Sequence, residues 1–95
     1  MISPQTIATL TRRLDQAAKA GDSQALARLG QIYDATAMRS RDGKRQAVLL
    51  LLSDACLMRA AAVWSREVRS WDAQRARQLE NQSADCLAGA LRRVS

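Results

Sequence analysis

The side chains that most often carry out catalysis are scarce in this chain of 95 residues. Histidine is absent, which removes the usual general base and the commonest metal ligand. Cys56 and Cys86 form no Cys-x-x-Cys motif, and no glycine-rich phosphate-binding loop is present. The nine acidic residues are scattered singly, with no pair at the i,i+3 or i,i+4 spacing that holds a metal on a helix. We therefore predict a protein with no catalytic residue, no metal site and no cofactor, and we expect no small-molecule substrate.

Arginine offers a different chemistry, the binding of anions. The chain has 15 basic residues, most of them Arg, and a formal net charge of +6. The planar guanidinium group makes paired hydrogen bonds with phosphates and carboxylates, so the charge favours an anionic partner. Codon usage in a GC-rich genome would also enrich Arg and Ala, and a solvated face is the other ordinary explanation. The candidate phosphate-binding residues are Arg39, Arg41, Lys44, Arg45, Arg59, Arg66 and Arg69.

A second candidate site is an apolar stripe at helical spacing. Its members recur every three or four residues, so they share one face of a helix: Leu57, Ala61, Trp64, Val68 and Trp71. Tryptophan dominates the energetics of many protein interfaces, which makes this stripe a candidate surface for a protein partner. Because the chain contains no Phe, the two Trp side chains are also the largest available for a core. Of these two interpretations we favour the core.

The composition predicts one domain, residues 1–95, of the all-α class. Ala and Leu dominate and are strong helix formers, whereas residues that favour strands are few. Proline occurs once and glycine four times, which leaves room for a few long helices. We expect a compact bundle of three or four helices.

Start and stop signals place the first two helices. Ser3-Pro4 begins a helix whose apolar stripe runs to Gly21, a typical C-terminal cap. Asp22 or Ser23 can cap the second helix, which fades into a polar loop at residues 39–44. The stripe of the first helix is Ile7, Leu10 and Leu14, and that of the second is Leu26, Leu29, Ile32 and Tyr33.

The third helix is apolar in almost every direction from Ala47 to Met58, so we expect it to be buried on all sides. So few other helices can barely cover it, and we expect a partner, such as a second copy, to cover part of it or of the Trp stripe. Asp54 lies within this run and is either a selectivity or pairing site or, as we favour, a side chain that meets an Arg of another helix or solvent. Near Asp72 the apolar stripe changes its angular position around the helix. Either a fourth helix begins there, or one long helix buries a different face from that point on. The final stripe is Ala76, Leu79, Cys86, Leu87, Ala90, Leu91 and Val94.

The sequence favours a cytoplasmic location without membrane contact. The first apolar residues are interrupted by Pro4 and by Arg12 and Arg13, which is unlike a secretion signal. The most apolar stretch, residues 47–64, contains two charged residues, which argues against a membrane span. We expect both cysteines to be free thiols on buried helix faces.

Two local resemblances concern residues 18–45. Residues 18–33 read Ala-Lys-Ala-Gly-Asp-Ser-Gln-Ala-Leu-Ala-Arg-Leu-Gly-Gln-Ile-Tyr, and with Asp42 they resemble one Sel-one-like repeat, a tetratricopeptide-type helix pair. Thr36 and Met38 stand where that family has glycines, and no second repeat follows. This resemblance implies a helical protein-interaction scaffold. The segment from Leu26 to Arg45 also resembles a phage-repressor helix-turn-helix, which implies DNA binding.

Together these features predict a non-catalytic protein-interaction module that binds through apolar helix faces. It would be an adaptor, a chaperone or a small subunit of a larger assembly, with a protein partner or a second copy on the apolar stripe. The alternative is a basic helical nucleic-acid-binding protein, or a subunit of a nucleoprotein complex, that contacts phosphates through its Arg clusters.

Overall fold

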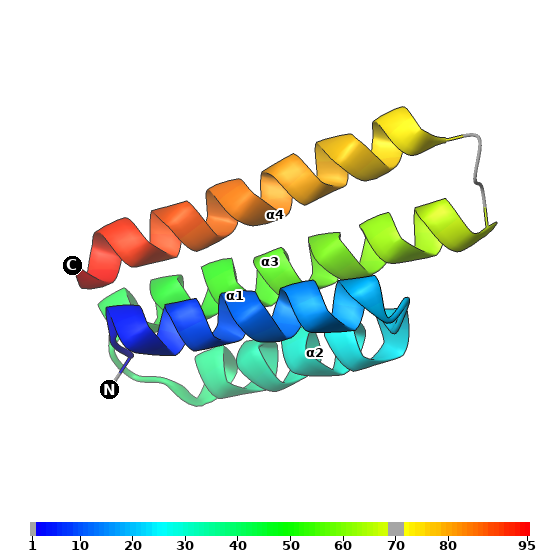
Figure 1. Ribbon diagram of the computed structural model, residues 1–95. Coiled ribbons are helices and arrows are strands. Elements are labelled where there is room, and N and C mark those ends of the chain that lie inside the picture. Colours follow the sequence, from blue (N-terminus) through cyan, green and yellow to red (C-terminus); the bar gives the residue numbers. More distant parts are fainter. Residues whose placement is uncertain (1, 69–71) are drawn as a thin grey trace.

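Four helices make up the computed structural model, which describes residues 2–68 and 72–95 (Figure 1). Successive helices run in opposite directions along a common axis. The predicted all-α bundle is confirmed, with four helices rather than three. Their bounds are α1 Pro4–Lys19, α2 Ser23–Arg39, α3 Gly43–Val68 and α4 Ala73–Val94.

Short polar side chains begin the helices where the sequence predicts. The Ser3 hydroxyl accepts a hydrogen bond from the Thr6 amide at 3.2 Å at the start of α1. Asp22, rather than Ser23, caps α2, and Asp72 caps α4 by accepting from the Arg75 amide at 3.3 Å. The change of phase near Asp72 therefore marks a separate fourth helix.

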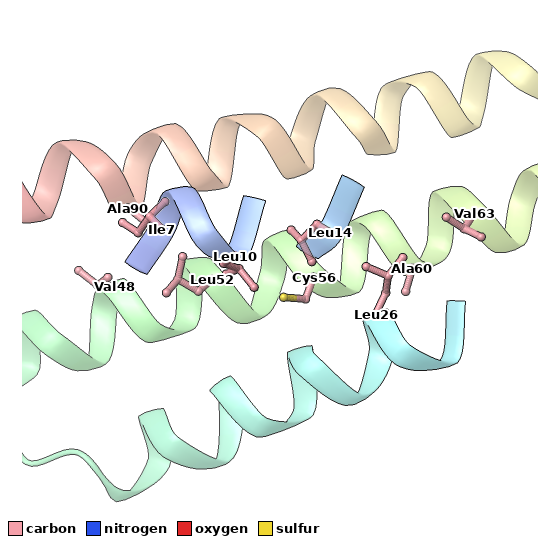
Figure 2. Close-up of a cluster of buried hydrophobic side chains, with 10 residues drawn as sticks. All are labelled: Ile7, Leu10, Leu14, Leu26, Val48, Leu52, Cys56, Ala60, Val63 and Ala90. Atoms are coloured by element: carbon pink, nitrogen blue, oxygen red, sulfur yellow. The ribbon is translucent and has the colours of Figure 1, made fainter. Parts of the chain in front are cut away.

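Helix α3 is the centre of a three-helix layer. It packs along α2 on one side and α4 on the other, and α2 and α4 do not approach each other within the described residues. Helix α1 touches all three helices from one face of this layer, as Figure 1 shows. The core lies beneath α1, where Leu52 and Cys56 of α3 meet Leu10 and Leu14 (Figure 2).

Small residues bring the helices of the layer close together. The Ser53 hydroxyl donates to the Gly30 carbonyl at 2.8 Å, which ties α3 to α2. The Ser83 hydroxyl donates to the Ala55 carbonyl at 2.7 Å, which ties α4 to α3. Both serines are buried, so these bonds satisfy polar groups that water does not reach.

Helix α3 is long and apolar enough, over Gly43–Glu67 with a mean hydropathy of 1.7, to cross a membrane by length and composition. Half of that apolar window is buried inside the bundle, and the core helix of a globular protein meets the same criterion. Here α3 packs against three amphipathic helices, which accounts for the buried half of that window.

Helices α2 and α3 form an antiparallel hairpin joined by residues 40–42. In a DNA-binding helix-turn-helix the two helices cross at about 90–120°. The segment from Leu26 to Arg45 has a different geometry, because α2 is one continuous helix through Arg39. The helix-turn-helix resemblance is therefore wrong.

The chain itself does not bury Ala47–Met58 on all sides, because among the described residues α3 has three neighbouring helices and a fourth, uncovered side. The expectation that a partner covers part of this stretch stays a prediction. Trp64 is 50% exposed, so the core interpretation of this side chain is wrong as well. Ile32 is exposed although the sequence pattern placed it on a buried face. Ile32 follows Gly30, which contacts α3, by two residues, so at 100° per residue its side chain points away from α3. Leu91 is likewise exposed at the margin of the α4 stripe.

Candidate protein-interaction face

The uncovered side of α3 carries a compact group of exposed side chains: Asp54, Leu57, Ala61 and Trp64, which we call the open face. At 100° per residue these positions span about 80° around the helix. They point away from Leu52 and Cys56, which face α1 in the core. The open face and α1 therefore lie on opposite sides of the α2–α3–α4 layer.

Two large apolar side chains are exposed on the open face. Leu57 is 41% exposed and Trp64 is 50% exposed, and Ala61 between them is exposed as well. Leu57 also lies directly over the α2–α3 contact, because a Cβ atom added to Gly30 would come within 2.7 Å of its Cδ2 atom. Three members of the predicted stripe thus form one surface. The other two, the Val68 side chain and Trp71, lie outside the described residues.

One acidic side chain, Asp54, belongs to the open face, and Asp85 of α4 lines a hollow together with Arg92 and Arg93. Asp54 and Asp85 form no ion pair within residues 2–68 and 72–95. Burial, followed by the negative charges of Asp54 and Asp85, raises the pKa of the Cys86 thiol, so both carboxylates lie near this residue of α4. The prediction that Asp54 meets solvent or an Arg resolves in favour of solvent.

The predicted phosphate-binding residues divide into two groups. Four of them lie at the α2–α3 connection, are exposed and make no ion pair among the described residues: Arg39, Arg41, Lys44 and Arg45. Arg93 from the last turn of α4 joins Lys44 and Arg45 around a hollow of about 290 Å³. The sequence analysis missed Arg93, because only the bundle topology brings the end of α4 beside the start of α3. We call these five cations the basic end.

Arg59 and Arg66 belong to a different part of the molecule. Arg59 pairs with Asp15 of α1 at 3.3 Å, and Arg66 pairs with Glu80 of α4 at 2.5 Å. At 1.5 Å per residue, Arg59 lies about 21 Å along α3 from Arg45. These two residues therefore join helices together and do not extend the basic end. Arg69 lies outside the described residues.

The remaining reactive groups are two free thiols, Cys56 and Cys86, as expected. Cys56 is buried in the core, and this burial raises the pKa of its thiol to about 11. Cys86 is half-buried rather than buried. Since the thiolate is the nucleophile, neither environment activates cysteine chemistry at neutral pH. No group of His, Cys, Asp or Glu within the described ranges has the arrangement of a metal site.

Comparison with known proteins adds no relative to this description. No protein-family model, curated protein or solved structure matches the chain. The resemblance of residues 18–42 to a Sel-one-like repeat therefore stays a prediction. The open face and the basic end are the two candidate functional surfaces of the described chain.

Proposed function

We propose that this chain is a non-catalytic protein-interaction module that binds a protein partner through the open face. The observation that carries this proposal is the joint exposure of Leu57, Ala61 and Trp64 on the uncovered side of the central helix. The role is that of an adaptor, a chaperone or a small subunit of a larger assembly. A helical protein-interaction scaffold is also what the Sel-one-like resemblance implies.

The energy available from Trp64 supports this proposal. A Trp side chain buries roughly 150–250 Å² when fully covered, so covering its exposed half removes about 100 Å² from water. At about 25 cal/mol per Å² this corresponds to roughly 2.5 kcal/mol from one side chain, the size of an interface hot spot. Leu57 and Ala61 lie beside it and extend the apolar contact.

Photo-crosslinking tests the proposal at single-residue resolution. A photoreactive amino acid replaces Ala61 on the open face, and a matched variant carries it at the exposed Ala84 of α4. In extracts of the source cells we expect position 61 to crosslink to a discrete protein, and position 84 to give none. Adding Trp64→Glu to the position 61 variant should abolish the product. Equal crosslinking at both positions, or none at position 61, would contradict the proposal.

The basic end supports a second candidate function, nucleic-acid binding. Five cations gather there without ion pairs in the described chain, and the hollow that Lys44, Arg45 and Arg93 line contains one acidic side chain, Asp42, which caps α3. Phosphate-driven affinity falls steeply with salt because bound counterions are released. A titration of duplex and single-stranded DNA between low and moderate salt tests this function, with Arg41→Ala/Arg45→Ala as the variant. Binding that is absent, or that does not depend on salt, would eliminate it.

A further inference from the structure

The boundary between α1 and α2 is hollowed along much of its length. Two hollows, of about 460 Å³ and 350 Å³, lie between these helices and adjoin, because Arg13 lines both. Their lining residues recur every three or four positions in each helix, so each helix contributes one continuous wall. We call this surface the α1–α2 groove and define it by Arg13, Ala17, Arg28, Leu29, Ile32 and Tyr33.

The floor of the α1–α2 groove is apolar. Ala17, Leu29 and Tyr33 pack against the core with part of their side chains and line the groove with the rest. Ile32 stands beside them and is 60% exposed, more than Trp64 on the open face. A partner that covers these side chains therefore removes apolar surface from water, which favours binding.

The charged side chains that line the α1–α2 groove are all positive. Arg13 on α1 and Arg28 on α2 stand on opposite walls of the larger hollow, and both are exposed. Neither forms an ion pair with a described residue, and no acidic residue of the described chain lines either hollow. Burial and the charge of Cys56 raise the pKa of Tyr33, and the charge of Arg13 opposes this rise, so Arg13 lies near the apolar floor. A carboxylate placed between the two guanidinium groups accepts hydrogen bonds from both.

The walls of the groove favour a helical occupant. Both walls are helices, whose backbone amides and carbonyls bond within the helix, so they offer no strand edge to an extended peptide. A bound helix satisfies its own backbone groups, and its rows of side chains fit between two other helices. At 1.5 Å per residue, the α1 wall from Thr6 to Ala17 is about 16 Å long, which equals three turns of such a helix.

We propose that the α1–α2 groove binds an acidic amphipathic helix of a partner protein. The apolar stripe of that helix packs on Leu29 and Ile32, and a carboxylate beside the stripe lies between Arg13 and Arg28. The open face belongs to α3, so this contact is separate from the one proposed above. An adaptor with both surfaces joins two partner segments through one chain, and a test of either contact does not depend on the other.

A labelled synthetic peptide tests this proposal by fluorescence anisotropy with the full chain. The peptide has about 18 residues, enough to form a helix, with Leu at i, i+3, i+4 and i+7, Glu beside this stripe and Ala elsewhere. We expect it to bind the wild type, and a peptide with Gln in place of Glu to bind about tenfold more weakly. Arg13→Ala/Arg28→Ala and Ile32→Ala should each raise the dissociation constant of the Glu peptide by about tenfold.

Matched variants separate the groove from the rest of the surface. Arg75→Ala/Arg77→Ala removes the same charge from exposed positions of α4 and should bind the peptide like the wild type. Met38→Ala removes an apolar side chain that is 66% exposed on α2 but does not line the groove, and it should also have no effect. Trp64→Ala on the open face should likewise leave the affinity unchanged. Circular dichroism of each variant confirms that a loss of binding is not a loss of folding.

Other outcomes would overturn the proposal. No binding of the Glu peptide to the wild type up to about 1 mM would exclude it. Equal losses in Arg13→Ala/Arg28→Ala and in the α4 control would show that only the net charge of the chain attracts the peptide. Loss of binding in Trp64→Ala would place the peptide on the open face. Displacement of the peptide by duplex DNA, with weaker DNA binding by Arg13→Ala/Arg28→Ala, would assign the two arginines to phosphate binding instead.

Discussion

Two leucines five positions apart in α3 give the most quantitative test of the three-sided packing. Leu52→Ala and Leu57→Ala remove the same atoms from one helix, but Leu52 is fully buried and Leu57 is 41% exposed. Truncation of a buried Leu costs about 2.7–5 kcal/mol, because transfer energy is lost and a cavity remains. At position 57 the cavity opens to water and part of the side chain is already solvated, so we expect about 1 kcal/mol.

Urea unfolding followed by circular dichroism measures this difference. The protein concentration must be low enough for the wild type to be monomeric, because association stabilises the folded chain by mass action. With a slope of about 1–2 kcal/mol per M of urea, a further 2–3 kcal/mol lowers the midpoint of Leu52→Ala by about 1–3 M relative to that of Leu57→Ala.

Equal losses at the two positions would refute the proposed packing of α3. A loss at Leu57 as large as that at Leu52 would mean that this side chain is enclosed within the single chain, and the open face would not exist.

Three further outcomes follow from single sites. Gly21 follows α1 with a φ of +69°, so Gly21→Ala should lower the free energy of unfolding by about 1 kcal/mol. Gly43→Ala should not destabilise the chain, because the space around its Cβ position is open. Equal effects of the two substitutions on urea unfolding would contradict this prediction. Burial raises the pKa of Cys56 from 9.0 to about 11, so the folded chain keeps a proton that the unfolded chain releases. The contribution of the Cys56 thiol to the free energy of unfolding is complete below pH 9 and is lost as the pH rises to about 11. Between these pH values Cys56→Ala should lose less of its free energy of unfolding than the wild type, as measured by urea unfolding. Identical losses would show that Cys56 is not the cause of the pH dependence. Arg66→Ala should cost less than about 1 kcal/mol, because its ion pair with Glu80 is largely exposed, and a loss of several kcal/mol on thermal unfolding would show that the pair is more than a surface contact.

Much of the fold follows from local signals in the sequence. Pro4, Gly21, Asp22 and Asp72 mark helix ends through their backbone preferences and capping side chains, and each stands where the structure places a boundary. The apolar stripe of α1 also predicts its buried face correctly. These features depend on residues within a few positions of each other, so sequence alone determines them.

The surfaces depend on how the helices are arranged, which local periodicity does not encode. The sequence pattern around Trp64 is the same in a buried or an uncovered stripe. Trp64 is exposed because no helix of the described chain lies on the fourth side of α3. Arg59 and Arg66 were predicted to be part of a basic surface, but the packing of α3 against α1 and α4 pairs them with Asp15 and Glu80. Arg93 joined the basic end through the same tertiary contacts.

The central claim is that the open face is uncovered in the single chain and covered in the bound state. Acrylamide quenching of Trp64 fluorescence tests it directly in a Trp71→Phe variant, where Trp64 is the only tryptophan. We expect efficient quenching and red-shifted emission in the dilute folded chain, since half of the Trp64 side chain is in water. Quenching should then fall and the emission shift to the blue when the proposed protein partner is added and covers Trp64. Weakly quenched, blue emission from the dilute monomer would contradict the claim.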